Sequence, residues 1–385
     1  MTEKMNDKKL KIGIDASRNR SGGAKAHLIG ILAELDPFKY GIIEVHVWSF
    51  ESLLALLPDR SWLIKHSPVE LEQSLFKQLW WQAFNLSNEL KTAGCDILFT
   101  TDASTLCYFK PNVVLSQDLL SYEPGMMRYY GFGLARMRLI AILVLQNFAF
   151  RRSAGVIFLT QYVSNVIQKS CGPLARSVCI PHGVDAAFDQ CLAANVWPEE
   201  GERSIRCIYV SNAEMYKHQW VVIEALFLLI QKGYNLSLKL VGGGKGVAQK
   251  MVDESIARFD PQRVFVKQLD FIPKEEIPTH LIESDIFIFA SGCETFGITL
   301  LEGMSIGLPI ACSDRSSLPE TLQDGGVYFD PTDAKSIASA VEKIVKSTEL
   351  RLTISNRSKY LAQQYSWRRC AHETWAFVAD TELRK

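Results

Sequence analysis

Residues 291–305 read SGCETFGITLLEGMS and directly follow the apolar run Asp285–Ala290. An apolar run followed by a glycine-containing turn predicts a buried strand that leads into a helix, here starting near Phe296 or Gly297. The first turn of a helix has backbone N–H groups without internal partners and carries the positive end of the helix dipole. The stretch therefore predicts a binding site for a diphosphate.

Two glutamates flank this turn, Glu294 before the helix and Glu302 within it. At a rise of about 1.5 Å per residue, Glu302 lies roughly 8 Å beyond the first turn, about one sugar ring past the phosphates. Its carboxylate matches the adjacent hydroxyls of a ribose, whereas Glu294 lies where a transferred sugar is expected. Taken singly, each is better explained as a solvated helix residue or a charge favoured by the dipole. The pair, framed by Thr-Phe-Gly and followed by Gly307-Leu308-Pro309, favours the binding interpretation.

Further motifs accompany this stretch along the chain. They are Gly22-Gly23 with His27, Ile180-Pro181-His182-Gly183-Val184-Asp185, Tyr209-Val210-Ser211 with Lys217, Val241-Gly242-Gly243-Gly244, and Ser316-Ser317-Leu318-Pro319-Glu320. With them the chain resembles the nucleotide-sugar-dependent retaining glycosyltransferases of family 4, most closely from about 205 to 335. The resemblance implies the α/β GT-B fold, in which two doubly wound Rossmann-like domains face each other across a cleft.

Length and pattern agree with two domains. A chain of 385 residues with 48% hydrophobic content can bury two cores. Strands alternate with helical patterns in both halves, which predicts parallel sheets with crossover helices. The polar stretch 195–203 separates the halves into an N-terminal acceptor-binding domain, 1–195, and a C-terminal nucleotide-sugar-binding domain, 204–365. By the resemblance, a last helix, about 366–385, starts near Trp367 and returns to the first domain.

The strands expected in the first half are 10–16, 42–48, 96–99, 112–116, 155–159 and 177–180. Those expected in the second half are 205–211, 236–241, 264–267, 285–290 and 309–313. Helical patterns occupy most of the intervals, including single stretches at 73–91 and 134–152, and the tail from 333 is helical throughout.

Charge and cysteine usage restrict the class of protein. Lysine plus arginine equals aspartate plus glutamate at 42 each, so no net field directs the chain to nucleic acid. The nine cysteines are scattered without a Cys-x-x-Cys pair, which is typical of reduced thiols in a cytoplasmic protein. The polar first ten residues predict a mobile leader without a secretory signal. The longest uncharged apolar segment, 139–150, is shorter than the about 20 residues that span a bilayer, so it lies on a membrane at most.

No metal or other cofactor is expected. Two aspartates never stand two positions apart, and the seven histidines show no metal-ligand spacing. The charge on a departing nucleoside diphosphate must then be met by backbone donors and by Lys217, beyond the strand at 205–211. The cluster Gly242–Gly246 does not fit a nucleotide phosphate loop, because Val247 stands at the Ser/Thr position.

The resemblance assigns a role to each candidate residue. The catalytic residues are Glu294 and Lys217; the donor-binding residues are Asn212, Lys217, Gly242, Gly243, Glu294, Thr295, Phe296, Gly297, Leu301 and Glu302; the cleft or acceptor-side residues are Asp15, Gly22, Gly23, His27, Gln117, Asp118 and His182. Structural roles explain Asp15 and His182 about as well, and His27 nearly as well. The chain departs from the family at two positions, since Asn212 replaces a frequent arginine and Gln117 a frequent histidine. His218, beside Lys217, adds positive charge if it is protonated.

The segment from Pro124 to Val184 contains no acidic residue but several arginines, among them Arg151 and Arg152. A basic surface of this kind suits an anionic membrane or a diphosphate-linked acceptor. For the apolar residues 139–150 themselves, a core helix is the favoured interpretation over direct membrane contact. Reversing the charge of Arg151 and Arg152 would test whether this segment binds an anionic membrane.

The sequence and the resemblance together predict a metal-independent retaining hexosyltransferase. It is expected to transfer mannose or a similar hexose from a GDP- or UDP-linked donor to a glycan acceptor. An acceptor linked to polyprenyl diphosphate would fit the basic segment. The expected pathway is the synthesis of bacterial lipopolysaccharide O-antigen or capsule. It is expected in the cytoplasm or peripherally on the inner membrane. A non-catalytic nucleotide-sugar-binding subunit is the alternative that Asn212 and Gln117 keep open. A nicotinamide-dependent oxidoreductase fits less well, because no Gly-x-Gly-x-x-Gly motif follows the first strand.

Overall fold

The computed structural model describes residues 9–20, 22–189, 197–199 and 201–383. The chain folds as two compact units: unit 1 comprises residues 1–183 and 366–385, and unit 2 comprises residues 184–365. The division falls at Gly183, earlier than the boundary expected near 195. Most of the predicted leader, Cys191 and part of the polar stretch 195–203 lie outside the described residues.

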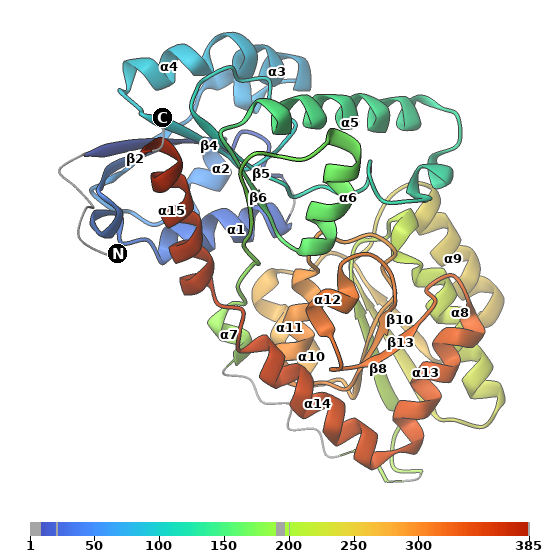
Figure 1. Cartoon of the computed structure of the whole chain (residues 1–385). Helices are drawn as coiled ribbons and strands as arrows, with labels where there is room; N and C mark the ends of the chain where they lie inside the picture. Colours follow the sequence, from blue (N-terminus) through green and yellow to red (C-terminus); the bar gives the residue numbers. More distant parts are fainter. Residues whose placement is uncertain (1–8, 21, 190–196, 200, 384–385) are drawn as a thin grey trace. The chain divides into compact units, whose positions relative to one another are not determined.

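Unit 1 contains a seven-stranded parallel sheet in the order β3-β2-β1-β4-β5-β6-β7 (Figure 1). Its strands are β1 (Leu10–Asp15), β2 (Ile42–Trp48), β3 (Leu63–His66), β4 (Ile97–Thr100), β5 (Asn112–Leu115), β6 (Gly155–Phe158) and β7 (Ser177–Cys179). The sequence pattern missed β3, because this edge strand is half exposed and includes Lys65 and His66, so it has no apolar run.

The helices of unit 1 follow the expected pattern with one division. They are α1 (Gly22–Ala33), α2 (Glu51–Leu54), α3 (Leu75–Phe84), α4 (Leu86–Thr92), α5 (Leu134–Arg152), α6 (Gln161–Cys171) and α15 (Trp367–Leu383), with 3₁₀ turns η1 (Pro37–Tyr40), η2 (Val69–Glu72) and η3 (Met126–Tyr130). The single stretch expected at 73–91 is divided at Asn85 into α3 and α4.

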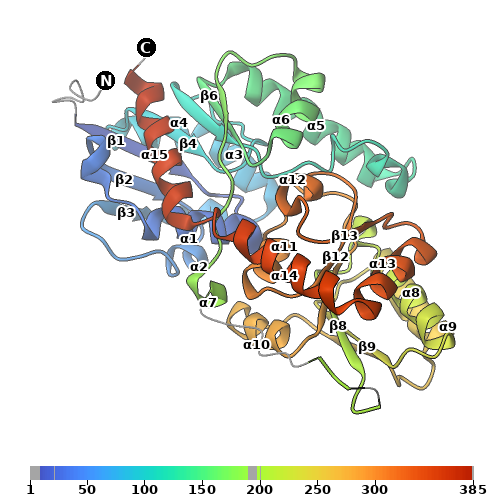
Figure 2. The same ribbon diagram turned by 60° about the horizontal axis from the view of Figure 1, so that its bottom comes forward.

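Helix α15 belongs to unit 1 although it follows unit 2 in the sequence. Figure 2 shows it lying across the sheet of unit 1, where it packs on α1, β4 and β6. Its start at Trp367 confirms the prediction, and the Trp367 ring fills the space that a Cβ at Gly30 would occupy. Further along, the Trp375 indole N–H donates to the carbonyl of Ile31 at 3.0 Å.

Unit 2 contains a six-stranded parallel sheet in the order β10-β9-β8-β11-β12-β13. The strands are β8 (Ile205–Val210), β9 (Leu236–Val241), β10 (Val266–Leu269), β11 (Ile286–Phe289), β12 (Ile310–Ser313) and β13 (Val327–Phe329). The helices are α7 (Ala186–Asp189), α8 (Gln219–Gln231), α9 (Val247–Phe259), α10 (Ile277–Ile282), α11 (Ile298–Ile306), α12 (Leu318–Leu322), α13 (Ala334–Lys346) and α14 (Thr348–Ala362), with 3₁₀ turns η4 (Met215–Lys217) and η5 (Lys274–Glu276). The pattern missed β13, a three-residue edge strand.

The strand order locates the site in unit 2. From β8 the chain continues outward to β9 and β10, whereas β11, on the other side of β8, begins the series toward β13. In an open parallel sheet, ligands bind at the carboxyl ends of the strands where the order reverses. Strands β8 and β11 pair directly, with Ile286 opposite Cys207, so the loops that follow them lie side by side.

Two further findings concern the chain as a whole. None of the eight cysteines among the described residues forms a disulfide bond. None of the described helices combines the length and the apolar composition that crossing a bilayer requires.

Candidate functional site

The turn from Ser291 to Gly297 connects β11 to α11 and is held by hydrogen bonds from two neighbouring loops. The Gly292 N–H donates to the carbonyl of Tyr216 at 2.6 Å, after β8. The Glu294 N–H donates to Ser316 Oγ at 3.0 Å, and Ser317 Oγ donates to the Glu294 carbonyl at 2.8 Å, both after β12. The backbone around Glu294 is therefore fixed before any ligand arrives.

Helix α11 begins at Ile298, close to the predicted start. Gly297 caps it in the left-handed conformation, with φ of 88°, which a residue with a Cβ rarely adopts. The first turn presents N–H groups that have no partner within the helix and carries the positive end of the dipole. Gly303 allows the helix to approach the buried ring of Phe287 on β11, since a Cβ there would lie 3.0 Å from it. Strand, turn and helix thus have the arrangement on which the prediction of an anion site rests.

Lys217 and Glu294 form a salt bridge across the switch point. Both side chains are half-buried, and the ammonium also lies 5.2 Å from the ring centroid of Tyr216 and 5.4 Å from that of Phe289. Tyr209 Oη donates to the Lys217 carbonyl at 2.7 Å, which anchors the backbone of the lysine. The structure therefore brings together the two residues predicted to be catalytic, each neutralising the charge of the other.

His218 does not supply the extra positive charge considered from the sequence. Its ring is buried, and burial lowers its pKa below the ordinary value. Its Nδ1 lies 3.2 Å from the carbonyl oxygen of Ala290, and a carbonyl only accepts, so Nδ1 donates. The neutral ring joins the loop after β8 to the end of β11, which is a structural role.

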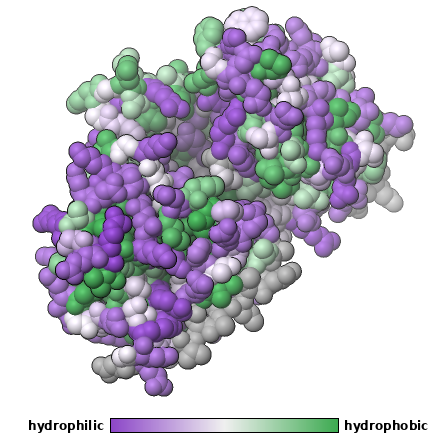
Figure 3. Space-filling model, turned by 180° about the vertical axis from the view of Figure 1, so that it is seen from behind, coloured by the Kyte–Doolittle hydropathy of each residue, from purple (hydrophilic) through white to green (hydrophobic). Residues whose placement is uncertain are grey.

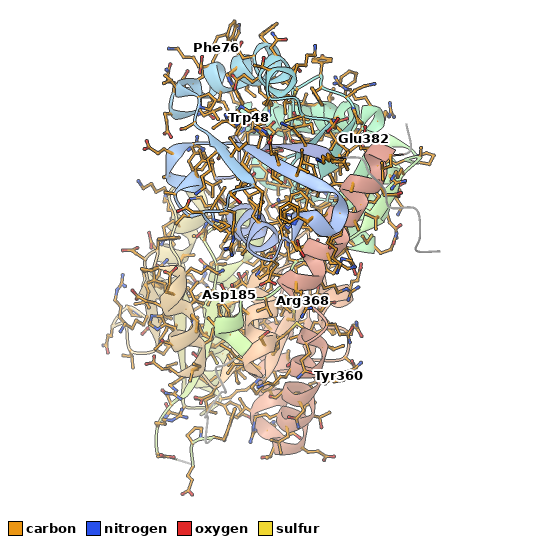
Figure 4. All side chains as sticks on the ribbon, turned by 90° about the vertical axis from the view of Figure 1, so that its left-hand side faces the viewer. Trp48, Phe76, Asp185, Tyr360, Arg368 and Glu382 are labelled. Atoms are coloured by element: carbon orange, nitrogen blue, oxygen red, sulfur yellow. The ribbon has the colours of Figure 1, made fainter. Side chains whose placement is uncertain are left out.

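Glu302 lies on α11 and is 5% exposed. Burial raises the pKa of its carboxyl from 4.5 to about 7, with a small opposing effect of the Lys274 charge and a further increase from Asp185. Lys274 Nζ and Asp185 Oδ2 are 3.3 Å apart, and Asp185, labelled in Figure 4, immediately precedes α7. The solvated-helix alternative for Glu302 is therefore wrong: a buried acid without a full counter-charge favours a hydroxyl partner.

The glycines after β9 lie at the same edge of the sheet. Gly242 has φ of 100°, and a Cβ on it would lie 2.6 Å from the carbonyl oxygen of Ser211. The loops after β8 and β9 can thus approach closely only because this residue is glycine. Gly243 borders Asp270, which follows β10 and was not singled out from the sequence. Asn212 is exposed beside them.

The remaining predicted donor residues differ in exposure. Phe296 and Leu301 are buried, and Phe296 packs edge-on against Tyr365 with ring centroids 5.3 Å apart. Thr295 is half-buried in the turn. Phe296 and Leu301 therefore support the turn and the helix from the protein interior, while Thr295 and Glu294 remain partly exposed. Lys274 was not singled out from the sequence, and Ser316 and Ser317 were quoted there within a motif but not as site residues. Their contributions, through charge or hydrogen bonds, are not revealed by sequence spacing.

The corresponding edge of unit 1 holds several predicted acceptor-side residues. Asp15 ends β1 and is buried, where it accepts hydrogen bonds from Ser17 Oγ at 2.6 Å and Gln82 Nε2 at 2.6 Å. Burial raises the pKa of Asp15 and of Asp118. Gln117 Nε2 donates to the Thr101 carbonyl at 3.2 Å. The polar groups at this edge are largely occupied by internal partners.

Gly22 and Gly23 begin α1 after β1, as expected, and a Cβ at Gly22 would meet open space. His27 and His182, predicted to line the cleft, instead lie in the interior of unit 1. Their Nδ1 atoms are 3.0 Å apart, and both rings pack against Trp367. Burial lowers the pKa of His27 to about 3 and that of His182 well below its ordinary value. Both rings are buried against Trp367 and therefore support the packing of α15.

Comparisons with known proteins relate unit 2 to a protein family and the whole chain to a fold. Residues 198–360 match the family model described as Glycosyl transferases group 1. O-antigen chain mannosyltransferase B from Escherichia coli is 26% identical over 167 residues, which cover 43% of this chain and 44% of that protein. The chain spans less than half the length of the curated relatives it matches.

Solved structures extend the likeness to the whole chain. Alr3699/HepE from Anabaena, in complex with UDP and glucose, superposes with a TM-score of 0.69 at 20% identity over 95% of this chain and 98% of that one. WaaG, a glycosyltransferase involved in lipopolysaccharide biosynthesis, gives 0.69 at 16% identity over 95% and 99%. At these identities the likeness concerns the fold. Residues 198–360 are therefore similar to the group 1 glycosyl transferases, and the chain has the two-unit α/β fold of GT-B glycosyltransferases such as WaaG.

Proposed function

We propose that this protein is a retaining glycosyltransferase that takes a hexose from a nucleotide-sugar donor bound in unit 2. The observation that carries the proposal is the Lys217–Glu294 salt bridge beside the first turn of α11, at the switch point between β8 and β11. A diphosphate on that turn would meet backbone N–H groups and the Lys217 ammonium. Binding would draw Lys217 toward phosphate and leave the Glu294 carboxylate to accept hydrogen bonds from the sugar.

The chemistry follows from these positions. The bond between the anomeric carbon and the diphosphate oxygen breaks, and a bond from the same face of the carbon to the acceptor oxygen forms. The leaving diphosphate takes the proton of the acceptor hydroxyl, while Lys217 and the helix N–H groups stabilise its charge. Glu302, buried on α11, holds the hydroxyls of the nucleoside. No bound metal has a role in this proposal, since Lys217 and the backbone supply the positive charge.

The donor and the acceptor are proposed from the relatives and from the surface. One matched relative is an O-antigen mannosyltransferase, and others are glycosyltransferases of amylovoran and capsular polysaccharide biosynthesis. We therefore propose a hexose such as mannose, carried by GDP or UDP, and a glycan acceptor in bacterial surface polysaccharide synthesis. A polyprenyl-diphosphate-linked acceptor fits the basic segment 124–184 of unit 1, and a cytoplasmic or peripheral membrane location follows from such an acceptor.

Thermal-shift measurements with GDP, UDP and ADP, followed by the corresponding sugar nucleotides, test the donor. We expect one base to raise the unfolding temperature of the wild-type chain and to lose its effect when Lys217 is replaced by methionine. Release of the nucleoside diphosphate from the sugar nucleotide, with lipid-linked glycan as acceptor, then distinguishes an enzyme from a non-catalytic binding subunit. Donor binding without release under any acceptor condition would support the subunit; absence of binding by every nucleotide would exclude both. The family match of residues 198–360 gives no support to an oxidoreductase.

A further inference from the structure

Helix α5 is more apolar than its place in unit 1 requires. Between Leu139 and Phe150 it carries no charged side chain. A helix that is apolar on all sides is normally buried on all sides. In unit 1 only one side is covered, by the burial of Leu139, Gln146, Ala149 and Phe150. The interpretation of 139–150 as a core helix is therefore correct for one side and wrong for the other.

The uncovered side forms one continuous stripe. It consists of Leu134, Met137, Ile140, Val144 and Phe148, which are 84%, 64%, 47%, 61% and 52% exposed. We call these five residues the α5 stripe. Their spacing of three or four places them on one face along about 20 Å of helix. Single exposed apolar residues are ordinary, whereas a contiguous stripe of this length marks a surface that binds something.

A second exposed stripe lies on the neighbouring helix α3. Phe76, Trp80 and Phe84 are spaced by four and exposed, and the Trp80 and Phe84 rings are 5.4 Å apart. Phe76 points outward from α3 in Figure 4. Both helices are bonded to the segment between β4 and β5: Gln82 of α3 accepts from the Leu106 N–H at 3.0 Å, and Gln146 of α5 donates to Ser104 Oγ at 3.0 Å. The two helices therefore flank the same connection in unit 1, each through a side chain on its buried side.

The charged residues of the segment that contains the α5 stripe are all basic. No acidic residue occurs from Pro124 to Val184. Arg128 and Arg138 are exposed near the amino end of α5, and Arg136 stacks over the exposed ring of Phe132 at 4.8 Å. Apolar side chains (green) project at the upper left of Figure 3, over the part of unit 1 that holds the start of α5. Apolar groups and arginines are thus interleaved on one surface.

Arg151 and Arg152, the arginines that the sequence suggested for testing, are engaged within unit 1. Arg151 Nε donates to the Cys171 carbonyl at 2.5 Å. Arg152 donates to the Cys107 carbonyl at 3.0 Å and lies 4.0 Å over the ring of Tyr108. Their replacement would disturb the packing of α5, so Arg128 and Arg138 are the arginines that report on an external partner.

We infer that the α5 stripe docks unit 1 on an anionic lipid bilayer, with α3 contributing its aromatic side chains. An amphipathic surface of this kind enters the boundary between headgroups and acyl chains by about 5–10 Å, and nearby arginines bind anionic headgroups. The Trp80 indole favours the same boundary, because its ring is apolar and its N–H is polar, whereas Phe76 and Phe84 add apolar area. A bilayer satisfies both the apolar stripe and the excess of arginine, whereas an apolar protein groove satisfies only the first.

Vesicle flotation with the full chain tests the inference. We expect the protein to float with vesicles that contain phosphatidylglycerol and to float several-fold less with phosphatidylcholine alone. The double variant I140Q/V144Q should reduce flotation on anionic vesicles at least tenfold, and R128E/R138E should abolish the preference for anionic lipid. L352Q and R258E, which alter exposed residues of unit 2, are the matched controls and should float like the wild type. Far-UV circular dichroism and thermal unfolding confirm that each variant is folded.

Two outcomes would overturn the inference. One is equal flotation of the wild type and I140Q/V144Q. The other is self-association of the wild type without lipid, detected by light scattering and abolished by I140Q/V144Q, which would assign the α5 stripe to a second copy of the chain. The assay contains neither donor nor acceptor, so its failure leaves the proposed transferase function intact, and loss of donor binding in unit 2 leaves this inference intact.

Discussion

The carboxyl edges of the two sheets share a topology but differ in chemistry. In unit 2, the edge carries a half-buried Lys217–Glu294 salt bridge and a buried Glu302 whose pKa is raised to about 7. In unit 1, Asp15 at the equivalent place is buried and receives its hydrogen bonds from Ser17 and Gln82. A doubly wound sheet thus provides the location of a site. Whether that location binds a ligand depends on how many of its polar groups already have partners in the protein.

The largest effect is expected from Glu294→Gln. The glutamine keeps the shape of the side chain but loses the charge that pairs with Lys217 and orients the sugar, so turnover should fall about 10³-fold. Donor affinity should change by less than about threefold, because the helix N–H groups and Lys217 still hold the diphosphate. Steady-state kinetics and calorimetry measure the two quantities. Glu254→Gln, an exposed position on α9, is the control. A loss of affinity as large as the loss of turnover would contradict the assigned role.

A smaller effect, on donor affinity, is expected from Glu302→Gln. Hydrogen bonds from ribose hydroxyls to a charged acceptor are stronger than those to a neutral one, so affinity at pH 8 should fall about tenfold. Because the pKa of Glu302 is about 7, wild-type affinity should fall as the pH is lowered from 8 to 6, and the variant should show no such dependence. Calorimetry with the nucleoside diphosphate across this range is the measurement. A pH dependence retained by the variant would assign it to another group.

The raised pKa of Glu302 also predicts that the stability of the ligand-free protein depends on pH. Its folded-state pKa is raised, so its contribution to stability is fully present below pH 4.5 and is lost as the pH rises through about 7. The loss amounts to roughly 3 kcal/mol. Glu302→Gln should therefore be more stable than the wild type at pH 8 and similar to it at pH 4.5. Denaturant unfolding followed by circular dichroism measures this difference. If the free energies of unfolding of variant and wild type differed by the same amount at both pH values, the raised pKa of Glu302 would be disproved.

The stability of unit 1 should depend on pH in the opposite direction, because of His27. Its pKa is lowered to about 3 by burial, so its contribution to stability is present above pH 6.5 and is lost as the pH falls. At pH 5 the loss is about 2 kcal/mol. His27→Leu should reduce the difference in α1 protection between pH 7.5 and pH 5, measured by hydrogen exchange because two units need not unfold together. His280→Leu in unit 2 is the control, and equal acid sensitivity of α1 in all three proteins would refute the prediction.

The smallest effect is expected at Asn212 and concerns the affinity of unit 2 for the nucleoside diphosphate. Asn212 is exposed after β8, where the resembling family often has arginine. Asn212→Arg adds a cation near the proposed diphosphate, and at an exposed position the gain should be only about two- to fivefold in affinity for the nucleoside diphosphate. The gain should decline at high salt. Asn212→Gln, which changes size without charge, should have no effect. A gain in both variants would show that size, and not charge, limits binding at this position.

Much of the architecture follows from local pattern. The apolar runs predicted every interior strand of both sheets, because a strand buried on both faces needs a continuous apolar sequence. The edge strand β3 was missed because it is half exposed and includes Lys65 and His66, and β13 was missed because its apolar run is only three residues long. The turn at Glu294 and the start of α11 were predicted closely, because glycine and the helix boundary are read from neighbouring residues.

The sequence by itself determined the two parallel sheets and the glycine-containing turn between Glu294 and Glu302. Only the tertiary structure decided which charges meet: the salt bridge between Lys217 and Glu294, the burial of Glu302, and the pairing of His27 with His182. It also decided that α5 leaves one apolar face uncovered. Local pattern depends on the conformational preference of neighbouring residues, whereas pKa, pairing and exposure depend on groups that are distant in the chain and adjacent only after folding.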